Sequence, residues 1–279
     1  MRHLLTIVCL LALPAAALAQ QRPLVTEDPE TVGANRTLIE GGFDYGRDAR
    51  FTVSGLEGHH LRVPVLGVSL GVGPAAEIQI DGALYQRLAI QQRFSAPLSS
   101  MVEATGDSTS SIDDAVVGAK VRVLAEGVSR PSLALRFATK LPNSSNESGL
   151  GLDTTDFLQS VLVAKTIQSV RVVGNVGLGI FGDPTRGDRQ NDMLIYGLSF
   201  ARAVTTAAEV VGEINGRLDT RSGEPPPGTE SRGMARFGAR YTVGAWRGDA
   251  GLLIGLTSND PSFGVTAGFT YVFDGFPVQ

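Results

Sequence analysis

The stretch FGVTAGFTYVF at residues 263–273 decides the fold that this sequence predicts. Successive side chains of a β-strand point to opposite faces, so the stretch would have two different sides. One side is apolar and ends in aromatic residues: Phe263, Val265, Ala267, Phe269, Tyr271 and Phe273. The other side is small and mostly polar: Gly264, Thr266, Gly268, Thr270 and Val272. Strands of soluble sandwiches can share this pattern, so the rest of the chain must decide between a sandwich and a membrane barrel.

The N-terminus has the pattern of a cleaved export signal over residues 1–19. A short basic start at Arg2 and His3 precedes an apolar run at residues 4–13 and a small-residue cleavage site at 17–19. The apolar run is shorter than the ~20 residues of a spanning helix. Cys9 lies inside the signal and is the only cysteine of the chain. The mature protein therefore has no disulfide and no thiolate chemistry.

Composition restricts the class of protein without deciding it. The chain has 34 glycines and 12 phenylalanines, yet its mean hydropathy is only +0.09. A membrane barrel gives such a middling value because every second residue of a strand faces a polar lumen. The formal net charge of -4 argues against binding to nucleic acid. Composition alone leaves a soluble periplasmic β-protein equally open.

The two-residue alternation recurs in twelve segments, each near the ~9–11 residues that cross a bilayer at a tilt. They cover residues 36–45, 60–71, 76–88, 113–124, 132–141, 155–166, 170–181, 191–202, 205–218, 232–243, 246–257 and 263–273. Segment 191–202 is apolar on both sides, so its facing stays open. Pro64 is unfavourable for a strand in mid-sheet. We predict an all-β fold, a transmembrane antiparallel β-barrel of about twelve strands.

The connections between these segments alternate in length. Those at 47–58, 89–111, 142–154, 182–190 and 219–230 are long and polar, whereas those at 72–75, 125–130, 167–168, 203–204 and 244–245 are short. Only 258–261 is short for its class. Long external loops and short periplasmic turns are typical of outer-membrane barrels. We therefore predict a periplasmic lead-in at residues 20–35, a barrel at 36–273 with both termini periplasmic, and a C-terminal tail at 274–279.

Charged residues recur on the face of these segments that would line the lumen. Arg232, Arg236 and Arg240 are spaced four apart and so share one side of a strand. The predicted lumen-lining residues are Arg136, Lys140, Arg171, Asn175, Glu209, Glu213, Arg232, Arg236, Arg240 and Asp249. One interpretation is a charged pore lining that selects solutes. The other is that a small barrel fills its interior with paired charges and conducts little.

Catalytic and metal-binding patterns are weak. His59 and His60 are the only histidines of the mature chain, and neighbours on a strand point apart, which disfavours a shared metal. Either could assist a loop serine in a lipid-modifying enzyme, but no spacing supports this. Asp183, Asp188 and Asp192 lack the spacing of an EF-hand. We predict no enzyme, no cofactor and no metal.

Three stretches resemble the outer-membrane family described as "putative MetA-pathway of phenol degradation". They are residues 22–33, RPLVTEDPETVG, followed by a strand with Glu40; FATKLP at 137–142, followed by a Ser/Gly loop, Asp153, Asp156 and Lys165; and GNVG at 174–177. The resemblance covers residues 22–273. It implies an outer-membrane barrel for uptake of aromatic or other small organic compounds, and it brings no catalytic residues. Outer-membrane barrels usually end on the final aromatic residue, whereas here residues 274–279 follow Phe273.

We therefore expect a passive outer-membrane channel for small, including aromatic, organic molecules, narrowed by the 89–111 connection. The alternative is a structural or surface-interaction barrel with a plugged lumen. The expected partners are outer-membrane lipid, a small-molecule solute and the barrel-assembly machinery.

Overall fold

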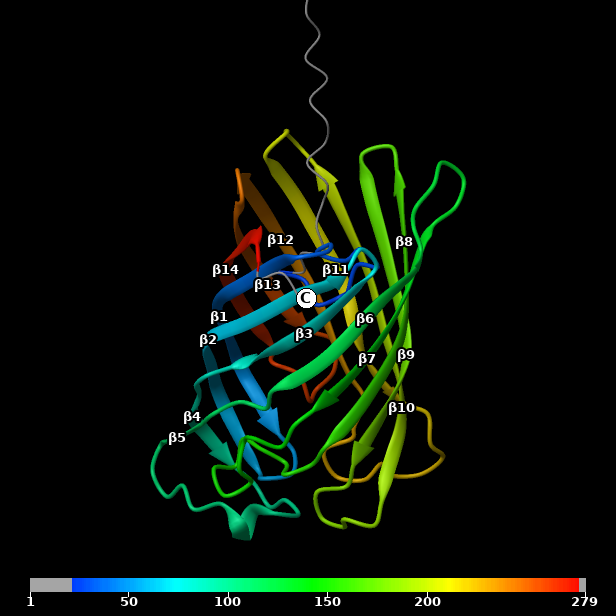
Figure 1. The fold of residues 1–279 in the computed structure, drawn as a ribbon. Helices are drawn as coiled ribbons and strands as arrows, with labels where there is room; N and C mark the ends of the chain where they lie inside the picture. The colour runs from blue at the N-terminus through cyan, green and yellow to red at the C-terminus, as the bar shows by residue number, and fades with distance from the viewer. Residues whose placement is uncertain (1–21, 276–279) are drawn as a thin grey trace, which may run out of the picture.

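The computed structural model describes residues 22–275, which form one antiparallel β-barrel (Figure 1). The predicted export signal and all but two residues of the predicted tail lie outside the described residues. The strands are β1 (Arg36–Phe51), β2 (Leu56–Gly73), β3 (Ala76–Ala83), β4 (Gln86–Arg93), β5 (Ser108–Ser111), β6 (Val116–Leu124), β7 (Ser132–Lys140), β8 (Asp156–Ile167), β9 (Val170–Gly182), β10 (Gln190–Ala203), β11 (Ala208–Asp219), β12 (Arg232–Val243), β13 (Trp246–Gly255) and β14 (Phe263–Asp274). A short 3-10 helix, η1, spans Ser99–Met101. No helix within residues 22–275 is long and apolar enough to cross a bilayer.

The barrel closes between its first and last strands. β1 pairs with β14 from Arg36 opposite Asp274 to Arg47 opposite Phe263, and its other edge pairs with β2. At two positions around the barrel, two short strands take the place of one long strand. β3 and β4 pair with successive halves of β2, and β6 and β5 pair in turn with β3 and β4. The predicted twelve-stranded barrel is confirmed.

The interruption between β3 and β4 lies opposite Pro64. Proline lacks the N–H that a ladder needs, so it is found at edges and bulges. The β1–β2 register shifts between Gly42 and Asp44, where two residues of β2, Val63 and Pro64, lie opposite Phe43 alone. Val63 still donates its N–H to the Tyr85 carbonyl at 2.8 Å, and Leu84 donates to the Pro64 carbonyl at 3.1 Å. The unfavourable proline is thus accommodated at a bulge without opening the wall.

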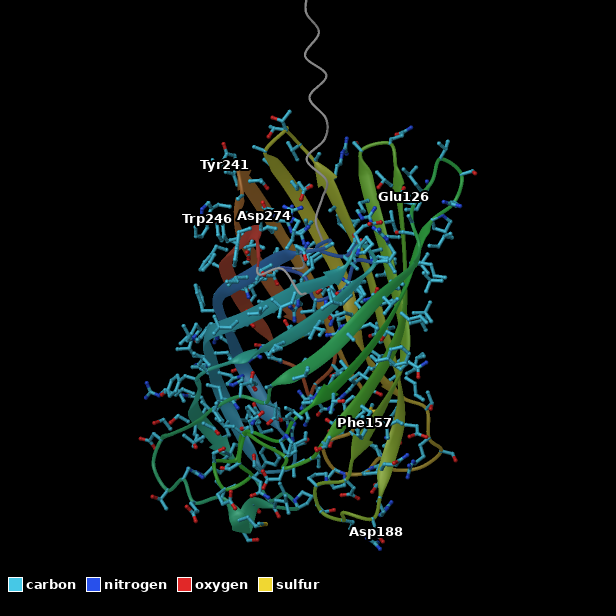
Figure 2. All side chains as sticks on the ribbon, viewed as in Figure 1. Glu126, Phe157, Asp188, Tyr241, Trp246 and Asp274 are labelled. Atoms are coloured by element: carbon cyan, nitrogen blue, oxygen red, sulfur yellow. The ribbon has the colours of Figure 1, made fainter. Side chains whose placement is uncertain are left out.

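The outer surface is apolar, as the alternation predicts. Large side chains on it include Phe157, Val176, Leu198, Phe237, Tyr241 and Trp246. Tyr241 and Trp246 project from the exterior near the end with the short turns (Figure 2). Trp246 stacks on Tyr271 with ring centroids 4.3 Å apart, as in the aromatic girdles of membrane barrels. On β10, Leu194, Leu198 and Phe200 are exposed while Met193 is fully buried, so the even-numbered residues face outward.

Two predicted loops are partly wrong. The 47–58 segment forms no charged loop: β1 continues to Phe51, and β2 starts at Leu56 after a four-residue turn. The 89–111 segment is likewise strand as far as Arg93 and again from Ser108. The exposed residues of these extensions are polar, such as Arg47, Gln91 and Arg93, whereas the apolar residues Phe51, Leu56 and Ile90 pack in a cluster. A strand that extends beyond the apolar belt loses the alternation by which it could be recognised.

Candidate functional site

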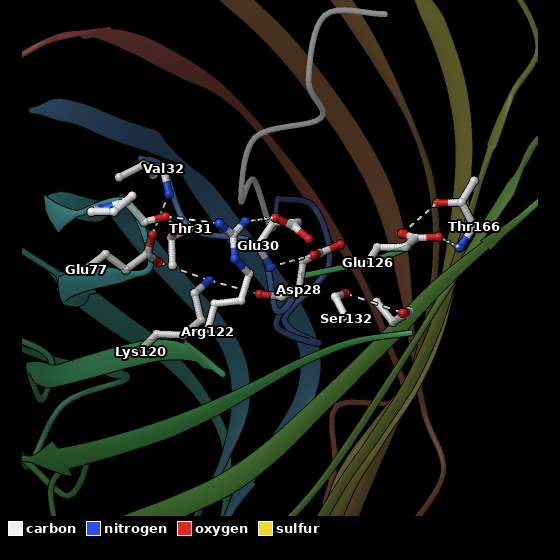
Figure 3. Close-up of polar contacts among 12 residues, drawn as sticks. Asp28, Glu30, Thr31, Val32, Glu77, Lys120, Arg122, Glu126, Ser132 and Thr166 are labelled. Atoms are coloured by element: carbon white, nitrogen blue, oxygen red, sulfur yellow. Dashed lines mark hydrogen bonds and ion pairs between the residues drawn. The ribbon is translucent and has the colours of Figure 1, made fainter. Parts of the chain in front are cut away.

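Residues 22–35, called here the N-terminal segment, run inside the barrel at the end with the short turns (Figure 3). Leu24, Thr31 and Val32 are at most 5% exposed. The segment forms no strand, so barrel side chains satisfy much of its backbone. Val32 donates its N–H to Glu77 at 2.7 Å, and Thr26 donates to Glu213 at 2.8 Å. Residues 22–35 of the predicted lead-in thus lie against the lumen wall.

Acidic residues of the segment pair with basic residues of the wall. Glu27 lies 3.2 Å from Lys120 and 3.1 Å from Arg136. Asp28 pairs with Arg171, and Glu30 pairs with Arg122. Burial acts to raise the pKa of Glu27, but Lys120 and Arg136 outweigh it and hold that pKa below its usual range. The carboxylate of Glu27 therefore stays ionised in the lumen.

Lys120 is fully buried and is surrounded by acceptors. Its Nζ lies 3.0 Å from Glu77 Oε1 and donates to the Asp28 carbonyl at 2.9 Å. Figure 3 shows Lys120 and Arg122 directed at the N-terminal segment. Buried charges need this degree of compensation, because an uncompensated one costs several kcal/mol.

Arg22 ties the start of the segment to the closing strands. Its guanidinium donates to Thr266 Oγ1 and to the Ala267 carbonyl, both at 2.9 Å. Its Nε lies 3.5 Å from Asp249, and Arg240 donates to its backbone carbonyl at 2.7 Å. The start of the segment therefore contacts β12, β13 and β14, the last three strands of the barrel.

Lumen-facing glycines make room for the segment. A Cβ at Gly197 would lie 2.7 Å from Thr26 Oγ1, and a Cβ at Gly251 would lie 3.3 Å from Pro23 Cβ. Val32 packs in a small apolar cluster with Leu38 and Val272. The wall is thus shaped to the segment by missing side chains as well as by charge.

The contacts in the structure divide the ten predicted lumen residues into two groups. Six contact the N-terminal segment: Arg136, Arg171, Asn175, Glu213, Arg240 and Asp249. Four do not: Glu209 pairs with Arg240 at 3.8 Å, Arg236 with Glu213 at 3.4 Å, Lys140 with Asp156 at 2.9 Å, and Arg232 donates to the carbonyl of Arg50 at 3.0 Å.

A cavity of about 740 Å³ occupies the lumen between the segment and the long loops. Val25, Thr26 and Glu27 bound it on one side. On the other side it is bounded by the loop residues 52–54, 149–152, 228 and 260–261. We call it the loop-side cavity. Its wall combines charged residues with apolar ones such as Leu158, Phe181 and Ile195.

The loops around the cavity pack on one another. Ser54 Oγ donates to the Gly149 carbonyl at 2.7 Å, and Leu56, Leu88 and Leu150 form a buried cluster beside it. None of the described residues lining the cavity comes from 89–111, so that connection does not border the loop-side cavity, and its narrowing of the lumen elsewhere stays a prediction. Its β4 and β5 portions pair with the wall, whereas the tips at 52–54 and 149–152 reach the lumen.

The two histidines show no catalytic arrangement. His60 lines the cavity, with Nε2 3.0 Å from Gln86 Oε1 and its ring edge-on to Phe51 at 5.3 Å. His59 lies beside Tyr45, with ring centroids 6.1 Å apart. Over residues 22–275 neither histidine hydrogen-bonds a serine, and no group of three His, Cys, Asp or Glu could hold a metal.

The interior partners Arg22, Glu27, Lys120 and Glu77 are missing from the predicted set. One signal could have found the acidic ones. The predicted lumen residues hold six cations, Arg136, Lys140, Arg171, Arg232, Arg236 and Arg240, against three anions, Glu209, Glu213 and Asp249. Such an excess needs further carboxylates inside the barrel, and residues 27–30, EDPE, supply three.

A closed, even-numbered antiparallel barrel with an apolar exterior and a charged lumen defines the porin-like class of outer-membrane β-barrels. The chain belongs to the family described as "Putative MetA-pathway of phenol degradation", whose model matches residues 21–273. The predicted resemblance is confirmed. No curated protein sequence matches the chain.

Solved structures share this fold at low sequence identity. The COG4313 outer membrane channel from Pseudomonas putida F1 superposes with a TM-score of 0.61 at 13% identity, covering 88% of this chain and 98% of that one. The NanC porin superposes with a TM-score of 0.52 at 10% identity, covering 84% and 98%. At such identities the likeness concerns the fold alone.

Proposed function

We propose that this chain is an outer-membrane channel through which small organic molecules, including aromatic ones, diffuse. The observation that carries the proposal is the loop-side cavity of about 740 Å³, which lies in the lumen of a barrel. This volume is within the range of about 300–1,000 Å³ that small-molecule sites occupy. The family description, which refers to phenol degradation, supports aromatic compounds as cargo.

The orientation follows from the connections. The short turns, 74–75, 168–169, 204–207 and 244–245, lie at the same end as both ends of the described chain. In outer-membrane barrels that end faces the periplasm and the long loops face outward. A solute from outside would enter the loop-side cavity first and meet the N-terminal segment next. Insertion would require the barrel-assembly machinery, and the exterior would contact outer-membrane lipid.

A second candidate is a barrel that does not transport. The N-terminal segment favours it, because its ion pairs and buried residues occupy the lumen. In this alternative the loop-side cavity would be a closed-ended pocket, and the barrel would serve as a structural or surface-interaction module. For neither function do we propose a catalytic role for His59 or His60.

Single-channel recording in planar bilayers tests the choice. We expect discrete currents from folded mature protein, and uptake of small organic solutes by liposomes that contain it. A variant lacking residues 20–32 serves as the comparison, with heat-modifiable gel mobility as the control for folding. Silence from the folded wild type, together with currents from the shortened variant, would reject the channel in favour of the plugged barrel.

A further inference from the structure

We propose that the loop-side cavity binds small organic carboxylates through Arg217 and Arg232. The inference rests on the proposed channel function and names the substrate class of the same lumen. The two arginines are directly opposite each other on β11 and β12, and both line the cavity. Like charges in this position repel one another, so an anion placed between them would be favoured.

The hydrogen bonds of both guanidiniums go to neutral acceptors. Arg217 donates from Nη2 to the Gly228 carbonyl at 2.7 Å and from Nε to the Glu230 carbonyl at 3.2 Å. Arg232 donates to the carbonyls of Asn259 and Arg50. Within residues 22–275 neither guanidinium forms an ion pair, and Arg217 Nη1 has no hydrogen-bond partner. Donors are therefore left for a ligand.

The other cations at the cavity differ in this respect. Arg62 pairs with Asp44 and Asp113, and Lys140 pairs with Asp114 and Asp156. Arg136 pairs with Glu27 and Asp81. These charges are already compensated, so a solute anion gains little beside them.

Glu230 and Asp260 act electrostatically on both arginines, but at longer range than an ion pair, and each accepts a backbone N–H. Glu230 accepts from the Gly228 N–H at 3.0 Å, and Asp260 accepts from the Gly233 N–H at 2.9 Å. Within residues 22–275 Arg217 and Arg232 are thus the cavity-lining cations that have carboxylates nearby but form no direct ion pair with them. A guanidinium presents its N–H groups as a fork that matches the two oxygens of a carboxylate.

The surroundings of the pair suit an apolar or aromatic body on the ligand. Arg217 lies over the ring of Phe181, 4.7 Å from its centroid, which fixes the plane of the guanidinium. Phe181, Ile195 and Met234 line the same cavity. A carboxylate on the arginines would leave an attached ring against these side chains.

Equilibrium binding to the detergent-solubilised mature protein at low salt tests the inference. The probes are benzoate, benzyl alcohol and benzylamine, which have similar bodies and different charge. We expect benzoate to bind about tenfold or more tightly than the other two, and Arg217→Gln or Arg232→Gln to weaken benzoate binding about tenfold, as for a lost hydrogen bond to a charged group. Arg93→Gln is the matched control, because Arg93 is exposed and donates only to the Gly106 carbonyl within the described chain.

Unchanged benzoate binding in both folded glutamine variants, or benzylamine binding as tight as benzoate binding, would overturn the inference. If a glutamine variant does not fold, Arg217→Lys and Arg232→Lys keep the charge and lose the fork, and each should still weaken benzoate binding measurably. Binding and conductance are independent readouts. Currents without benzoate binding would reject the inference alone, whereas arginine-dependent binding without currents would reject the channel and leave the site.

Discussion

On the short-turn side of the lumen, Lys120 is fully buried between Glu27 and Glu77, whereas on the loop side Arg217 and Arg232 face a cavity and donate to backbone carbonyls instead of carboxylates. Both regions belong to one barrel and one polar interior. They differ because the carboxylates of the N-terminal segment pair with cations of the first region, whereas the segment borders the cavity of the second without pairing with Arg217 or Arg232. Cations that pair with carboxylates of the same chain stabilise the fold. Cations that form no ion pair within the chain are available to a ligand.

The largest effect should come from breaking the compensated region at its centre. Lys120→Met leaves Glu77 and Glu27 buried without their shared cation, so we expect the free energy of unfolding to fall by about 3–5 kcal/mol. Urea titration in micelles, followed by tryptophan fluorescence of Trp246, measures it. The double variant Lys120→Met with Glu77→Gln should recover part of the loss, and a double variant no more stable than the single one would contradict this account.

The loop side should depend on apolar packing instead. Leu88 is fully buried against Leu56 and Leu150. Leu88→Ala should cost about 2–4 kcal/mol through the cavity it leaves, and it should increase proteolysis near residue 150. Cleavage within residues 22–35 should stay at the wild-type rate, as checked by mass spectrometry of limited digests. Equal loosening of both regions would show that they are not separable.

Gly197→Val tests whether the wall is shaped to the segment. Its side chain would collide with Thr26, and overpacking of this kind costs about 1–3 kcal/mol. Gly174→Val on the neighbouring strand is the matched control, because a Cβ there meets nothing within 4 Å. Denaturant midpoints of the two variants should differ by this amount. Similar midpoints would mean that the N-terminal segment moves aside for the added side chain without a loss of stability.

The smallest effect concerns pH. Because the pKa of Glu27 is held below its usual value, its ionic contribution is present above the pKa of the unfolded chain and is lost as the pH falls through the lower folded value. The wild type should exceed Glu27→Gln in free energy of unfolding by about 1–2 kcal/mol. That difference should stay constant from pH 5 to 8 and shrink below about pH 4. Paired urea titrations across this range measure it, and a difference that grows in acid would contradict the assignment.

The barrel wall was predictable from sequence because its signal is local. Alternation within each strand and the lengths of the connections were enough for the strand number. The N-terminal segment was not predictable in this way, since its partners are remote: Glu27 meets Lys120 93 residues later. The facing of 191–202 was ambiguous for a related reason. Thr26 packs on Gly197, so the interior side of β10 needs little polarity there.

The charged residues of the lumen were predictable from sequence only in part. Their inward direction follows from the two-residue period, but their pairing does not. Arg136 and Arg232 have the same chemistry and the same facing, yet one meets Glu27 and the other meets backbone carbonyls. Only the path of the segment and of the loops distinguishes them, and neither path has a periodic signal.

The contact of Arg22 with the closing strands has a consequence for how the chain folds. Arg22 is at the start of the described chain, and Thr266, which it contacts, lies 244 residues further on. Contacts of such sequence separation form late and slowly, because the intervening chain must be ordered first. The residues at the start of the described chain thus wait for the last strand before their site exists. Joining β1 to β14 and seating residues 22–35 are therefore expected to be a single cooperative step at the end of folding.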